Sequence, residues 1–245
     1  MNRRNNDLDV TTEAFHTPLA PYFADTYNTL NSVVQGVVLG ALFFAFTEQE
    51  GNIPPLFYLK AFLVFLTTCL MWHRYVTHTQ WVAWRLNLID TLIPMGFAVT
   101  QLFVIWTMMK NSHPRYFSQA FTVLTIMGTI AYWRALSKVK SVEKETRILL
   151  AKHFADEYFG SGFYDELLLY EKRCFKHVHV LALVSLLTTF SVYLPWVEQK
   201  TQDWYVTVVL VLSSLVFGSF DLNMQLRRLN KLPACSYPHK DYFCR

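Results

Sequence analysis

The stretch that decides the fold is RLNLIDTLIPMGFAVTQLFVIWTM, residues 85–108. Its length and apolar character suit a membrane-spanning helix, since about 20 such residues cross a bilayer core of roughly 30 Å. An ionisable residue in a span is costly and usually faces protein or water. The polar positions recur at steps of three and four, so they share one helix face. We expect a path or a ligand to be lined by Asn87, Asp90, Pro94, Phe97 or Ala98, and Gln101.

Asp90 allows two interpretations. Pro94 has no N–H and crowds the carbonyl of Asp90, so a kink leaves that carbonyl free beside the carboxylate, where a cation or water binds. Alternatively, Asp90 lies near the membrane edge and pairs with Arg85 or Arg74 as a topology anchor. Both interpretations stay open at this point.

The whole chain is apolar. Of its 245 residues 53% are hydrophobic, and the mean hydropathy is +0.21. Apolar stretches of roughly 18–25 residues, the length of a membrane helix, lie at 29–47, 54–73, 84–108, 116–136, 178–197 and 203–222. We therefore expect an all-α integral membrane protein with six transmembrane helices.

The basic residues predict the orientation. Most of the 22 Lys and Arg residues lie in segments that share one side of the membrane. Because positive charge marks the cytosolic side, we expect both termini to be cytosolic, in a bacterial inner (plasma) membrane. The net charge of +4 is then a topology signal, and no nucleic acid is expected as a partner. The first 28 residues lack the pattern of a cleaved signal peptide.

These features predict a division of the chain into five parts. A cytosolic arm precedes four spans, a cytosolic helical hairpin separates them from two further spans, and a basic tail follows. The expected bounds are 1–28, 29–136, 137–177, 178–222 and 223–245.

Two other spans carry polar faces. Asn31 and Gln35 lie on the first span, and Thr122, Thr125 and Thr129 follow one face of the fourth. Such groups line a pore or, alternatively, bond to neighbouring helices and to the carbonyls of the preceding turn. Small residues four apart permit close helix packing, as expected for Gly36 with Gly40 and for Ser214 with Gly218.

Lys60 lies inside the second span. Its long stem allows the ammonium group to reach the headgroups, which is the simpler interpretation. A buried pair with an aspartate is the alternative.

The predicted hairpin begins with a helix from 137 to about 159. Gly160, Ser161 and Gly162 favour a break, after which a second helix runs into the fifth span. Both helices are amphipathic, and their apolar faces need a partner: each other together with a second copy of the chain, the membrane surface, or another protein. The residues expected to dock a cytosolic protein are Leu149, Leu150, Phe154, Leu167 and Leu168.

Function is less constrained than fold. The sequence lacks nucleotide-binding loops and hydrolase motifs, and we expect neither an enzyme, nor a cofactor, nor a metal site. The polar faces favour an oligomeric channel subunit for small cations, in contact with the lipid bilayer. One alternative is a membrane-embedded sensor, scaffold or effector that recruits a cytosolic partner through 137–177. A solute transporter is the third possibility.

Overall fold

The structure is a computed structural model, and it describes residues 20–49, 51, 53–81, 88–110, 114–144, 157–193 and 199–229. These residues form six α-helices: α2 (Ala20–Thr47), α3 (Pro55–Trp81), α4 (Leu88–Met109), α5 (Pro114–Ser141), α7 (Glu157–Ser191) and α8 (Gln199–Leu229).

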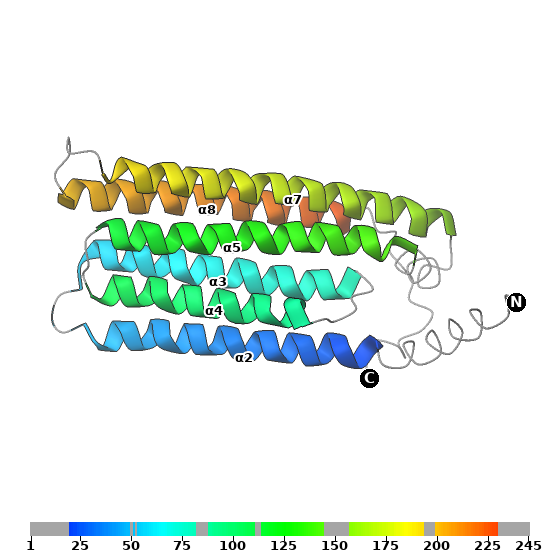
Figure 1. Ribbon diagram of the computed structural model, residues 1–245, viewed down its shortest axis with the longest axis horizontal. Helices are drawn as coiled ribbons and strands as arrows, with labels where there is room; N and C mark the ends of the chain where they lie inside the picture. The colour runs from blue at the N-terminus through cyan, green and yellow to red at the C-terminus, as the bar shows by residue number, and fades with distance from the viewer. Residues whose placement is uncertain are drawn as a thin grey trace, which may run out of the picture.

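The helices run alternately up and down along the long axis of the molecule (Figure 1). We divide the chain into two groups of three consecutive helices, because the three helices of each group contact one another. The first half consists of α2, α3 and α4, and the second half consists of α5, α7 and α8. The halves meet where α3 packs on α8 and α4 packs on α5, and the contact between α4 and α5 is more extensive than any within the first half.

Five of the helices are long and apolar enough to cross a membrane, which indicates a multi-pass integral membrane protein. The apolar segments are Asn28–Thr47, Pro55–Val76, Ile89–Met109, Tyr164–Ser191 and Thr201–Met224. Contact with a lipid bilayer follows from these segments.

The fourth predicted span, in α5, is not among these five segments. Its polar residues face inward: Ser118 and Thr122 are buried. Its exposed positions include Val123, Ile126 and Trp133, which are apolar. The average hydropathy of α5 therefore reflects side chains inside the bundle, while its outer surface resembles that of the other helices.

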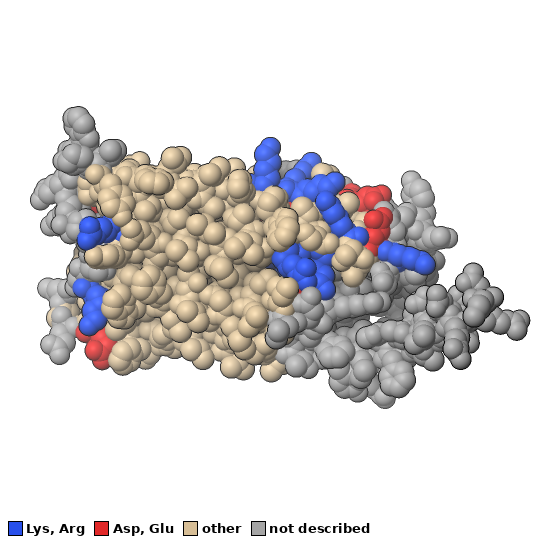
Figure 2. Space-filling model, in the orientation of Figure 1, with Lys and Arg blue, Asp and Glu red and all other residues tan. Residues whose placement is uncertain are grey.

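Charged side chains gather at the two ends of the bundle and leave a broad uncharged band between them (Figure 2). Lys and Arg are concentrated at the end where α3 and α5 finish, and we call this the basic end. The opposite end, where α3 and α5 begin, is the far end. The band between them exposes large apolar side chains such as Phe43, Leu187 and Val216, as a lipid-facing surface requires.

The predicted break at residues 160–162 is wrong, because α7 runs through all three of them. Likewise α5 continues past position 137, where the hairpin was expected to begin, and ends at Ser141. Glycine inside a helix costs only about 1 kcal/mol. The buried Tyr164 hydroxyl donates a 2.8 Å hydrogen bond to the Val139 carbonyl, which ties the first turns of α7 to α5.

Gly218 brings α8 close to α3, and its substitution gives a first prediction. A Cβ atom at Gly218 lies 3.0 Å from Cδ2 and 3.3 Å from Cδ1 of Leu70. We expect Gly218→Val to destabilise the bundle by about 1–3 kcal/mol through overpacking. The measurement is the apparent melting temperature of the purified protein in detergent.

Gly36→Val is the matched control, because no atom lies within 4 Å of a Cβ at Gly36. We expect it to change the free energy of unfolding of the monomer by no more than about 0.5 kcal/mol, and hence to leave the melting temperature almost unchanged. If Gly36 and Gly40 pack against a second copy, as predicted, this variant shifts the protein toward monomer in size-exclusion chromatography. Equal melting temperatures for Gly218→Val and the wild type contradict the close packing of α8 on α3.

Candidate functional site

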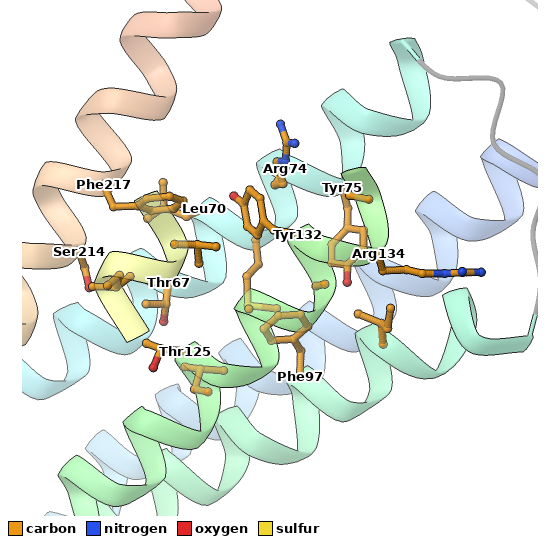
Figure 3. A pocket seen from close by; sticks show the side chains of 18 of the residues that line it. Thr67, Leu70, Arg74, Tyr75, Phe97, Thr125, Tyr132, Arg134, Ser214 and Phe217 are labelled. Atoms are coloured by element: carbon orange, nitrogen blue, oxygen red, sulfur yellow. The ribbon is translucent and has the colours of Figure 1, made fainter. Parts of the chain in front are cut away.

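A partly open cavity of about 110 Å³ lies where the two halves meet. Its lining comes from α3 and α4 of the first half and from α5, α7 and α8 of the second. Most lining side chains are apolar, including Leu70, Phe97 and Phe217 (Figure 3). The cavity is therefore a central, largely apolar space between the halves.

At the basic end, Arg74 of α3 joins the halves. Its guanidinium Nη2 donates to Glu171 Oε2 on α7, and the Glu171 side chain is fully buried. The same guanidinium lies over two aromatic rings, 5.0 Å from the centre of Tyr132 and 4.7 Å from the centre of Tyr170. Cations over ring faces are stabilised by the ring quadrupole.

The Arg74 contacts continue into a hydrogen-bonded network within the second half. The Tyr170 hydroxyl donates to Asp221 Oδ1 on α8, and Cys174 Sγ lies 3.5 Å from the same oxygen. Tyr170, Cys174 and Asp221 are all buried. Four helices thus contribute to one buried polar network at the basic end.

Asp90 makes a second connection between the halves at the basic end. Its Oδ1 accepts a 3.1 Å hydrogen bond from Arg134 Nε on α5, and its Oδ2 lies 3.4 Å from Lys138 Nζ. The Asp90 side chain is buried, whereas those of Arg134 and Lys138 are 25% and 13% exposed. Two cations therefore neutralise this carboxylate.

Lys60 joins the halves at the far end. Its Nζ lies 2.7 Å from Asp203 Oδ1 and 2.8 Å from Oδ2 on α8, and 4.8 Å from the centre of the Phe117 ring. The Lys60 residue is only 7% exposed. The alternative of a buried lysine–aspartate pair thus describes Lys60 better than the simpler one, in which its ammonium reaches the headgroups.

Polar contacts within each half are of another kind. In the first half, Gln101 Nε2 donates a 2.9 Å hydrogen bond to Thr68 Oγ1. In the second, the Thr122 hydroxyl lies 3.1 Å from the Ser185 carbonyl and 2.8 Å from Thr189 Oγ1. The ion pairs described above all cross between halves, whereas these neutral hydrogen bonds hold each half together.

The threonine stripe of the fourth span bonds inside the bundle. Thr125 donates to the Thr122 carbonyl at 2.9 Å, and Thr129 donates to the Thr125 carbonyl at 3.0 Å. These bonds match the alternative in which preceding-turn carbonyls satisfy the hydroxyls. Thr125 nevertheless lines the cavity.

Of the residues predicted to form the polar face of the third span, only some line the cavity. Asp90 lines the cavity at its basic end, Pro94 is buried within α4, and Gln101 is bonded to α3. The guanidinium of Arg74, one suggested partner of Asp90, contacts Glu171 instead. The other suggested partner, Arg85, and Asn87 lie outside the described residues.

On α2, two predicted polar residues are buried. Asn31 is 0% and Gln35 3% exposed, and among the residues that the structure describes none is hydrogen-bonded to their side-chain nitrogen and oxygen atoms. Gly36 and Gly40 lie on the exposed side of the same helix. The two amides face inward but are not part of the cavity lining.

The residues predicted for helix packing and for partner docking lie in different parts of the bundle. Ser214 lines the cavity from α8 and Gly218 packs on Leu70, whereas Leu167 is buried and Leu168 half-buried in the bundle. The predicted docking residues Leu149, Leu150 and Phe154 lie outside the described residues. The docking surface is thus untested by the described part of the chain, and Leu167 offers little surface to a partner.

Comparison of this chain with protein-family models, with curated proteins and with solved structures gave no match. Among the residues that the structure describes, no group of three or more His, Cys, Asp and Glu side chains is placed to hold a metal ion. The site must therefore be interpreted from its own geometry.

Asp90→Asn gives a second prediction. The neutral amide leaves Arg134 and Lys138 without their carboxylate, but both are partly exposed and gain hydration. We expect a loss of about 1–2 kcal/mol, less than for a fully buried pair. Thermal unfolding in detergent measures it, with the exposed Glu143→Gln as control. A wild-type melting temperature for Asp90→Asn argues against the ion pairs at this carboxylate.

Proposed function

We propose that this protein is a membrane transport protein whose two halves move against each other and open the central cavity to one side at a time. The observation that carries the proposal is the position of the ion pairs. Lys60 with Asp203 connects the halves at the far end, while Arg74 with Glu171 and Asp90 with Arg134 and Lys138 connect them at the basic end. The cavity lies between these two layers of charge.

Ion pairs at these positions suit reversible closure. A pair in the protein interior gains Coulomb energy but loses hydration, so its net contribution is small compared with either term. When the halves separate and water enters, hydration replaces the lost contact. An end of the bundle can therefore open at a cost of a few kcal/mol, while the hydrogen bonds inside each half persist.

The proposal includes a membrane orientation. All six helices cross the bilayer, α5 included, because its exposed face is apolar. The basic end lies in the cytosol, as the excess of Lys and Arg predicts, and the membrane is the bacterial inner membrane. Substrate sites of many transporters likewise lie at the interface between two groups of helices near the middle of the bilayer.

A cation channel formed by several copies is the second candidate. The observation that favours it is the pair of buried amides, Asn31 and Gln35, whose unpartnered polar atoms suit contact with water or ions. Asp90 adds little to a cation preference, because two basic side chains already contact it.

The proposal is tested by the reaction of two introduced cysteines with a water-soluble, membrane-impermeant thiol reagent in proteoliposomes. The native cysteines are first replaced by alanine. Ser214→Cys places a thiol in the cavity, whereas Val216→Cys, two residues away and 69% exposed, places one on the lipid-facing surface. We expect the Ser214→Cys thiol to react steadily as the cavity opens, and the Val216→Cys thiol to remain unmodified. Equal rates for the two thiols contradict an interior path.

A further inference from the structure

The central cavity has a lining that defines the kind of molecule it holds. Its walls combine aromatic and aliphatic side chains from both halves, among them Phe97, Phe121, Leu181 and Phe217. Figure 3 shows Thr67 and Ser214 toward one side of this space, with Phe97 on the other. Such a lining favours an apolar ligand over water, because apolar cavities of about 150 Å³ stay dry and bind benzene or xenon.

The volume limits the size of the ligand. At about 110 Å³ the cavity is somewhat smaller than those benzene-binding cavities. A group of about one aromatic ring therefore fills this space. Because the space is partly open, its volume limits the size of the group that enters it.

The charged residues at the border argue against a charged ligand. Arg74, Asp90 and Arg134 line the basic end of the cavity, and each is already engaged in an ion pair. A ligand charge in the apolar part of the cavity loses its hydration without gaining a partner, which is strongly unfavourable. The ligand is thus uncharged.

Ser214 supplies a polar contact. The residue is fully buried and lines the cavity, and its hydroxyl has no hydrogen-bond partner within the described part of the chain. The hydroxyls of Thr67 and Thr125 also line the cavity, but both donate to carbonyls of their own helices. A buried hydroxyl without a partner costs free energy that a ligand's hydroxyl or carbonyl group recovers.

From these observations we infer that the cavity binds a small, uncharged, mostly apolar molecule of about one aromatic ring, held by a hydrogen bond to the Ser214 hydroxyl. This inference deepens the proposed function, on which it rests for the role of the ligand as substrate. The binding site itself is defined by the cavity alone, so binding can be measured without transport.

Phenol and benzene are suitable probes, because they share a ring and differ by one hydroxyl group. The protein in detergent is labelled with ¹³C at its methionine methyl groups. Met71 lines the cavity, while Met95 is 46% exposed on the lipid-facing side of α4 and serves as an internal control for partition into the micelle. Ring-current shifts of the Met71 methyl signal, titrated with each probe, give the dissociation constants.

We expect both probes to shift the Met71 signal saturably and phenol to bind more tightly. Ser214→Ala should weaken phenol binding about three- to tenfold, the value of one neutral hydrogen bond, and leave benzene binding unchanged. Equal, non-saturable shifts at Met71 and Met95 overturn the inference, as does an unchanged phenol affinity in Ser214→Ala. Ala131→Leu, which fills part of the cavity, checks the site and should abolish both shifts.

Failure of this inference can be told apart from failure of the proposed function. Saturable phenol binding with an unreactive Ser214→Cys thiol means a binding site without a transport path, which overturns the ligand's role as substrate. A reactive thiol without phenol binding leaves the path standing and overturns the assignment of the ligand.

Discussion

Replacing Glu171 by methionine should destabilise the bundle by about 3–5 kcal/mol, since it leaves the guanidinium of Arg74 buried without its carboxylate. Arg74 is 8% exposed and Glu171 is 0% exposed, so neither gains enough water when the other is lost. Arg74→Met should have an effect of similar size, because Glu171 then keeps a buried charge. The measurement is the apparent melting temperature and the yield of monodisperse protein in detergent.

The double variant Arg74→Met with Glu171→Met separates loss of the pair from loss of packing. Both charges are then absent, so most of the stability should return, as when other buried ion pairs are replaced by apolar side chains. Lys172→Met is the matched control, since this neighbouring lysine is exposed, and its effect should stay within about 0.5 kcal/mol. If Glu171→Met is as stable as Lys172→Met, Arg74 and Glu171 do not form a buried ion pair at the basic end.

Replacing Lys60 by methionine should open the far end. Within the described part of the chain, Lys60 and Asp203 form the ion pair that joins the halves at that end. A hydrogen bond to a charged group contributes about 1.5–3 kcal/mol. Its loss should raise the population with an open far end, and hence the reaction rate of a Ser214→Cys thiol, about 10- to 100-fold. The rate is measured in proteoliposomes with the reagent on the far side.

Two further variants control for this effect. Lys110→Met removes an exposed lysine at the same end and should leave the rate unchanged. Asp203→Asn removes the other member of the pair and should raise the rate as Lys60→Met does. A folded Lys60→Met protein with the wild-type rate argues that Lys60 and Asp203 play no part in closing the far end.

Much of the fold was predictable from the sequence, because membrane helices need long apolar segments. All six predicted spans coincide with helices, although only five pass as spans on length and apolar character. The break at 160–162 was wrong because glycine is a weak helix breaker when the segment packs on a neighbour, as Tyr164 does on Val139. The packing of α7 on α5 therefore outweighed the preference of these residues for a helix break.

The candidate site was less predictable, since ion pairs between distant helices leave no local pattern. Arg74 and Glu171 are 97 positions apart, and Glu171 lies within the segment predicted to be a cytosolic hairpin. Asp90 was expected to face protein or water rather than lipid, whereas its partners on α5 depend on which helices become neighbours. Charged residues near the ends of predicted spans were the feature of the sequence that could indicate such pairs. The lysine–aspartate alternative for Lys60 is an example.

The most direct test of the two moving halves is a distance measurement between spin labels at the far end. Lys110→Cys in the first half and Thr201→Cys in the second, both exposed, carry the labels in a background without native cysteines. Pulsed electron paramagnetic resonance should give two distance populations, and Lys60→Met should increase the longer one. A single distance that Lys60→Met does not change would contradict the movement of the halves and, with it, the proposed transport function.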